Sequence, residues 1–174
     1  MEEIKQSIIQ PFSNPIFIYK IPYNNDFRNS LINECTTLKD TSQTINPQYE
    51  HRQVGWQSKK ILFTTQEPNL KIISRIIDNA AWASIKSISP GIDSTKYNLG
   101  REGWININQK GTLHFPHIHG SSTLSGVFYV KVPKIKKIDN KDISKPGFIE
   151  FLDPRNDVAS FSKNIEELAT SLVF

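Results

Sequence analysis

The sequence predicts an α+β domain in which two helices precede a β-sandwich or barrel and pack on it. Two observations support this prediction. Before about residue 94, apolar residues recur at helical spacing in two segments, and from Lys96 onward they alternate with polar residues, as in strands. Helices followed by strands are typical of this fold class. We therefore expect one domain over residues 1–174, with a helical part (1–94) and a β-rich part (95–174).

The first elements of the helical part are expected to be a strand and a helix. Residues 15–21 predict the strand, and residues 26–39 predict the helix, with Asn25 or Asp26 as its N-cap. One face of this helix carries its apolar residues, which are Phe27, Leu31, Ile32, Cys35 and Leu38. Residues 40–60 are polar and predict a loop that includes the sequence Gly55-Trp-Gln-Ser58.

A second helix is expected from about Glu67 to Ser89. Pro68 suits a first helical turn, and Pro90-Gly91 is a typical helix-ending sequence. The predicted buried face consists of Leu70, Ile73, Ile77, Ala81, Ile85 and Ile88.

Four strands are expected in the β-rich part. The segments 102–108 and 112–119 flank a hairpin turn at residues 109–111, and 124–132 and 147–152 follow. Residues 156–174 show no strong strand pattern, and their last residues, Ser-Leu-Val-Phe, are expected to start a further strand. We therefore expect the β-domain to be C-terminally incomplete. An unpaired strand edge would then favour a homodimer or poor solubility.

The composition excludes several classes of protein. No apolar run approaches the roughly 18 residues of a membrane span, and the N-terminus lacks the pattern of a signal peptide. A single cysteine, Cys35, excludes an internal disulfide framework and is expected to be buried as a small apolar side chain. We therefore expect a cytoplasmic protein.

The net charge of +4 comes largely from one segment. Acidic residues and a proline interrupt its lysines and no aromatic residue lies among them, so we predict a solvated loop rather than a nucleic-acid surface. A basic rim of this kind would favour an anionic cosubstrate. The lysines are Lys131, Lys134, Lys136, Lys137, Lys141 and Lys145.

His117 and His119 are the strongest candidates for a functional site. On a strand, residues i and i+2 point to the same face, so the two imidazoles would lie side by side and form half of a metal site. Neutral imidazoles suit Fe(II), Mn(II), Zn(II) or Ni(II). The alternative is a pair of polar residues on a solvated strand face. Candidates for a third ligand are weak, and they are His51, His114, Glu150 and Asp153.

Three stretches of the chain resemble a family of 2-oxoglutarate/Fe(II)-dependent oxygenases of marine bacteria and phages. They are residues 12–22, residues 55–58, and the segments from Trp104 to Arg155 that include Pro116-His-Ile-His119. The resemblance implies a double-stranded β-helix, or jelly roll, with N-terminal helices packed on it. It also implies Fe(II) and the cosubstrate 2-oxoglutarate.

The resemblance assigns roles to individual residues. His117 would be the proximal iron ligand, and His119 would stand where relatives carry an Asp or Glu. Asn106 and Tyr129 are our candidates for hydrogen bonds to the carboxylates of 2-oxoglutarate; their alternative roles are strand pairing and packing. The distal His and the following Arg or Lys of such oxygenases are not found before Phe174. We therefore expect weak metal binding and little turnover from this chain.

Two other classes of function remain open. Gly111, followed by five residues and then by the His117-x-His119 pair, is similar to the start of the cupin motif, but Thr123 and Leu124 stand where its Glu is expected. A non-enzymatic jelly-roll interaction domain is the other alternative. Metal content separates this interaction domain from the two metal proteins, and decarboxylation of 2-oxoglutarate separates the oxygenase from the cupin. The sequence specifies no substrate.

Overall fold

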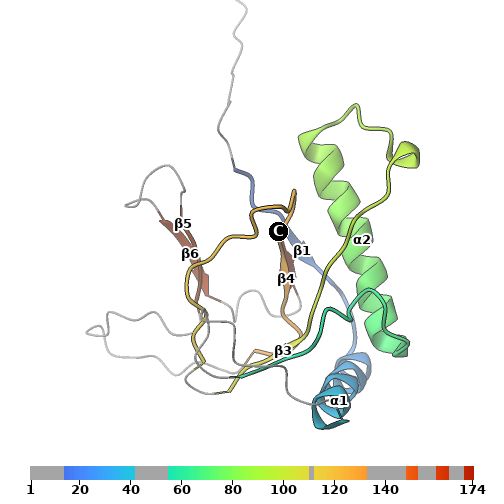
Figure 1. The fold of residues 1–174 in the computed structure, drawn as a ribbon, viewed down its shortest axis with the longest axis vertical. Coiled ribbons are helices and arrows are strands. Elements are labelled where there is room, and N and C mark those ends of the chain that lie inside the picture. Colours follow the sequence, from blue (N-terminus) through green and yellow to red (C-terminus); the bar gives the residue numbers. More distant parts are fainter. Residues whose placement is uncertain (1–13, 42–54, 110–111, 133–147, 153–159, 165–170) are drawn as a thin grey trace, which may run out of the picture.

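The computed structural model describes residues 14–41, 55–109, 112–132, 148–152, 160–164 and 171–174. Within these residues helices and short antiparallel strands are combined, as expected for an α+β fold (Figure 1). The helices are α1 (Asn25–Thr41), α2 (Pro68–Ile88) and the 3-10 helix η1 (Ser94–Lys96). The strands are β1 (Ile18–Lys20), β2 (Trp56–Gln57), β3 (Asn106–Ile107), β4 (Val127–Phe128), β5 (Phe148–Leu152), β6 (Ser160–Asn164) and β7 (Ser171–Val173).

Both predicted helices are present, and their ends follow from local chemistry. The side-chain oxygen of Asn24 accepts a hydrogen bond from the Phe27 amide at 2.8 Å and caps α1. The prediction of Asn25 or Asp26 as the cap was therefore wrong, because α1 begins at Asn25 and the residue before it holds the cap position. In α2, Pro68 lies in the first turn as predicted, and the amide of Ser89 donates to the carbonyl of Ile85 at the other end.

The N-terminus of α2 is capped by a side chain from α1. Its own N-cap residue, Glu67, makes no side-chain capping bond, and Pro68 has no amide hydrogen. The carboxylate of Glu34 accepts hydrogen bonds from the amides of Asn69 and Leu70, at 3.1–3.2 Å and 3.1 Å. It also accepts one from the side-chain amide of Asn69, at 2.6 Å. These bonds satisfy free amides of α2 and join the two helices.

The core lies between the two helices and the strands beside them. Leu31 of α1 and Leu70 and Ile73 of α2 are buried at its centre. Cys35 packs against this cluster, as predicted. The other partly buried apolar residues around it come from both helices and from the strand-bearing segments: Phe27, Leu38, Leu62, Ile76, Ile77, Ile105, Phe128 and Val130.

The buried face of α2 differs from the predicted one toward the C-terminal half of the helix. Ala80 and Ser84 are buried there, whereas Ile88 is 51 % exposed. Ser84 tolerates full burial because its hydroxyl is doubly satisfied. It donates to the carbonyl of Ala80 at 3.0 Å, so the Tyr19 hydroxyl at 2.8 Å must be the donor to Ser84 Oγ. This bond joins β1 to α2.

The largest described sheet has the order β1-β7-β4, with antiparallel pairing throughout (Figure 1). Its central strand, β7, comes from the segment 156–174, for which no strong strand was predicted, and β6 lies in the same segment and pairs with β5. The expectation of a strand at Ser171–Phe174 was therefore right, and the wider prediction for 156–174 was wrong. Leu172 and Val173 point to opposite faces of β7 yet are both 2 % exposed, so both faces of this strand are covered.

A two-stranded sheet pairs β2 with β3, with Trp56 opposite Ile107 and Gln57 opposite Asn106. The sequence Gly55-Trp-Gln-Ser58, predicted as part of a loop, is thus partly a strand with three buried residues, Trp56 to Ser58. Gly55 has a φ of +126°, which L-residues rarely adopt.

The strands predicted for 102–108, 112–119 and 124–132 are present only in part. Regular pairing covers two residues in β3 and two in β4. In the described part of 112–119, strand pairing is limited to a single β-bridge at His114. The described residues therefore show small antiparallel sheets with two packed helices, and a complete jelly roll is not visible in them. None of their helices is long and apolar enough to cross a membrane.

Candidate functional site

His117 and His119 lie side by side, in an irregular segment rather than in a strand. Their ring centroids are 5.1 Å apart and the ring planes are inclined at 71°. Both side chains are exposed. Two imidazoles at this separation can converge on one ion after small side-chain rotations, because each ligand nitrogen needs to be about 2.0–2.1 Å from the metal.

The tautomer of His117 follows from its hydrogen bond. Its Nδ1 lies 2.7 Å from the carbonyl oxygen of Phe115. A carbonyl can only accept, so Nδ1 carries the hydrogen, and in the neutral ring the lone pair is left on Nε2. A carbonyl bonded to the second ring nitrogen is the usual support of a metal-binding imidazole. His117 is thus in the state in which Nε2 can bind a cation.

The imidazole of His119 contacts the indole of Trp104. The ring centroids are 5.8 Å apart and the planes are inclined at 36°. Trp104 lies two residues before β3, so this contact joins the histidine pair to the β2–β3 sheet. The contact was not predicted from the sequence, in which the two residues belong to separate expected strands, 102–108 and 112–119.

The two candidates for cosubstrate binding lie on different sheets. Asn106 is exposed in β3, opposite Gln57. Tyr129 follows β4 directly and is half-buried, and burial raises the pKa of its phenol to about 12. Tyr129 is therefore a neutral hydrogen-bond donor at physiological pH.

A third ligand beside the histidine pair is not found in the described part of the chain, where no group of three His, Cys, Asp or Glu side chains is arranged to hold a metal ion. His114 is not part of the pair, and its Nε2 lies 3.2 Å from the side-chain oxygen of Asn108. Glu150 is exposed in β5. His51, Asp153 and the lysine-rich segment after Val132 lie outside the described residues. The residues present thus fit half of an iron site.

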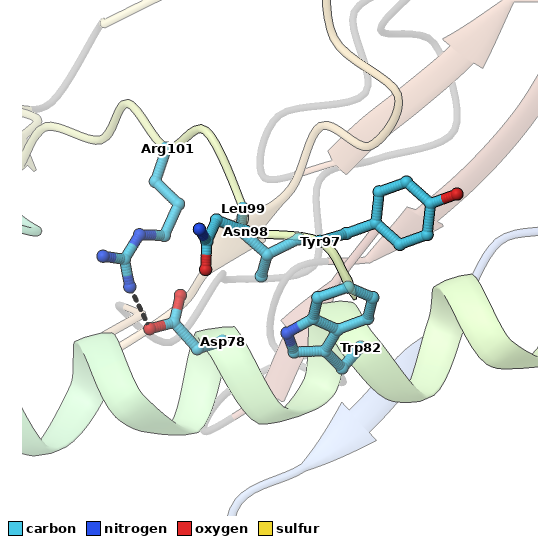
Figure 2. A pocket seen from close by; sticks show the side chains of 6 residues that line it. All are labelled: Asp78, Trp82, Tyr97, Asn98, Leu99 and Arg101. Atoms are coloured by element: carbon cyan, nitrogen blue, oxygen red, sulfur yellow. Dashed lines mark hydrogen bonds and ion pairs between the residues drawn. The ribbon is translucent and has the colours of Figure 1, made fainter. Parts of the chain in front are cut away.

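A second polar site lies on α2, and none of the residues that line it was predicted as a site residue. A pocket of ≈ 290 Å³ is lined by Asp78, Trp82, Tyr97, Asn98, Leu99 and Arg101, as Figure 2 shows. Arg101 donates to the Asp78 carboxylate, and its guanidinium lies 5.3 Å from the ring centre of Phe63. The ion pair holds the segment after η1 against α2.

Comparison with known proteins links the histidine pair to one family. No curated protein and no solved structure matches the chain. The matching family model covers less than half of the chain, but the matched part includes His117, His119, Asn106 and Tyr129. Residues 102–170 match the family described as "Putative 2OG-Fe(II) oxygenase".

Proposed function

We propose that the chain carries a 2-oxoglutarate- and Fe(II)-dependent dioxygenase domain of the hydroxylase type, built on a jelly roll. The observation that supports this proposal most is the histidine pair itself. The two rings lie 5.1 Å apart within the segment that matches the oxygenase family, and the hydrogen bond of His117 places the ring hydrogen on Nδ1 and the lone pair on Nε2. The substrate to be hydroxylated is not specified by any described residue.

Each candidate residue has a chemical role in this proposal. His117, through Nε2, and His119 hold the iron. Iron held there would activate O2, which is the oxidant, while 2-oxoglutarate would supply two of the four electrons and be converted to succinate and CO2 and the hydroxylated substrate would supply the other two. The phenol of Tyr129, with its pKa near 12, stays protonated and donates a hydrogen bond to a cosubstrate carboxylate. The exposed side-chain amide of Asn106 can donate a second one.

Metal binding by the pair is the first test. Because a chelate loses most of its affinity when one arm is removed, His117→Ala and His119→Ala should each abolish Ni(II) binding measured by titration calorimetry. His114→Ala is the matched control, since this ring pairs with Asn108 instead, and it should bind Ni(II) like the wild type. Equal loss in all three variants would show that the pair is not the metal site.

Cosubstrate turnover is the second test. Succinate formation from 2-oxoglutarate, with Fe(II) and ascorbate, should be low for this chain and should depend on both His117 and His119. Robust succinate formation would indicate that a third ligand lies within these residues, with Asp153 as the first candidate. Absence of metal binding would favour a non-enzymatic interaction domain.

A further inference from the structure

The backbone around Trp104 is held on both sides by the β2–β3 region. On one side, the carbonyl of Ile105 accepts from the Ser58 amide at 2.9 Å, and the Ile105 amide donates to Ser58 Oγ at 2.9 Å. On the other side, the carbonyl of Gly103 accepts from the Leu62 amide at 3.1 Å. Ser58 is 6 % exposed, so these bonds are shielded from competing water.

Close packing restricts the same stretch further. A Cβ atom at Gly103 would lie 2.8 Å from Phe63 Cε2 and 2.9 Å from Leu62 Cδ2, so the chain at this point runs directly against two apolar side chains. Trp104 therefore projects from a backbone with little freedom to move.

His119 is in the opposite situation. It is exposed and belongs to no helix or strand, and its backbone carbonyl accepts from the Ser122 amide at 2.9 Å to close a turn. An exposed imidazole on such a segment samples several rotamers. The contact with Trp104, at a centroid distance of 5.8 Å, connects the His119 ring to the restrained β2–β3 region.

We propose that Trp104 is a positioning residue for the metal-binding imidazole of His119. The indole selects the rotamer in which the His119 ring lies beside His117, so that two ligands are aligned before an ion arrives. Pre-alignment raises affinity because less side-chain freedom is lost on binding. This inference rests on the proposed metal site at the histidine pair.

Substitutions at Trp104 show whether Ni(II) binding depends on an aromatic ring in contact with His119 or only on a large apolar side chain at this position. Trp104→Leu removes the aromatic surface, and we expect it to weaken Ni(II) binding roughly tenfold in calorimetry, as for other residues that orient metal ligands. Trp104→Phe keeps a ring against His119 and should bind nearly as tightly as the wild type. Trp82→Leu is the matched control, since Trp82 lines the separate pocket on α2, and it should leave the affinity unchanged.

Tryptophan fluorescence gives a readout that does not depend on whether Trp104→Leu folds. Paramagnetic Ni(II) bound at the pair would quench an indole that contacts His119. The wild type and Trp82→Phe should both be quenched on titration with Ni(II), and Trp104→Phe should lose most of the quenching.

The outcomes distinguish this inference from the proposed function. No Ni(II) binding by the wild type would overturn the metal site itself. Binding without quenching in the wild type, or wild-type affinity in a folded Trp104→Leu variant, would leave the metal site in place and overturn the role of Trp104.

Discussion

At the residue scale, burial decides the chemical state of the groups that ionise at alkaline pH. Desolvation raises the pKa of Tyr129 to about 12, from an ordinary value of 10.0. Burial, and secondly the charge of Glu34, raises the pKa of the Cys35 thiol to about 11. At neutral pH Cys35 is therefore a protonated thiol packed against the core, which fits a structural role and not that of a nucleophile.

Tyr129 should make the stability of the protein sensitive to alkali. Its folded pKa lies above its unfolded value, so its stabilising contribution is complete below pH 10 and is lost as the pH rises toward 12. Urea unfolding of the wild type and of Tyr129→Phe should therefore show a smaller alkaline loss of stability in the variant.

The comparison of variants is needed because Cys35 and Tyr23 also have raised pKa values and act in the same direction. Tyr97→Phe is the control, since Tyr97 is 59 % exposed, and it should keep the full alkaline loss. An identical alkaline loss in Tyr129→Phe and the wild type would show that Tyr129 is not buried as described.

At the element scale, the pairing of α1 with α2 depends on a charged cap as well as on apolar contacts. Glu34→Ala would leave the amides of Asn69 and Leu70 without their acceptor, and we expect it to lower the free energy of unfolding by about 1–2 kcal/mol. Chemical denaturation followed by circular dichroism measures this loss.

Glu102→Ala is the matched control for the loss of one carboxylate. Glu102 pairs with Lys60 at the surface, with its side chain 64 % exposed, so its removal should cost about 0–1 kcal/mol. Similar losses in the two variants would argue against the capping role of Glu34.

The elements differ in how far the sequence alone predicted them. The bounds of α2 were predicted to within one residue because Pro68 and Pro90-Gly91 are local signals. The cap from Glu34, the bonds of Ser58 to Ile105 and the pairing of β7 with β1 and β4 were not predicted, because each joins residues far apart in the chain and leaves no local pattern.

The candidate site, too, was predicted from the sequence only in part. That His117 and His119 are neighbours was predicted from their spacing alone, even though the segment is not a regular strand. The support from the Phe115 carbonyl and from Trp104 could not be predicted, since the hydrogen bond depends on an irregular backbone and the ring contact on how two segments pack.

At the scale of the whole molecule, β7 joins the two ends of the described chain. It pairs with β1 on one side and β4 on the other. The amide of Phe174 donates to the carbonyl of Phe17, and the amide of Phe17 donates to the carbonyl of Phe174, each at 2.9 Å. A Cβ at Gly126 would lie 2.7 Å from the Val173 carbonyl, so β7 approaches the chain before β4 very closely. Whether edges of this sheet form a homodimer, as expected from the sequence, stays a prediction.

Truncation of a buried side chain in the central strand β7 should lower the stability of the whole fold. Leu172 is 2 % exposed, and we expect Leu172→Ala to lower the free energy of unfolding by about 2–5 kcal/mol. Leu152→Ala in β5 makes the same chemical change at a side chain that is 50 % exposed, and it should cost less than about 1 kcal/mol. Thermal unfolding of both variants tests this, and an equal cost would contradict the central position of β7.

The order β1-β7-β4 also has a consequence for the synthesis of the protein. A ribosome makes β1 early, but its partner β7 begins only at Ser171. The two helices, by contrast, can pair as soon as residue 88 has emerged. During translation β1 and β4 must therefore remain without their shared neighbour while α1 and α2 are already packed, and in that interval their exposed backbone groups are open to capture by chaperones or by other nascent chains.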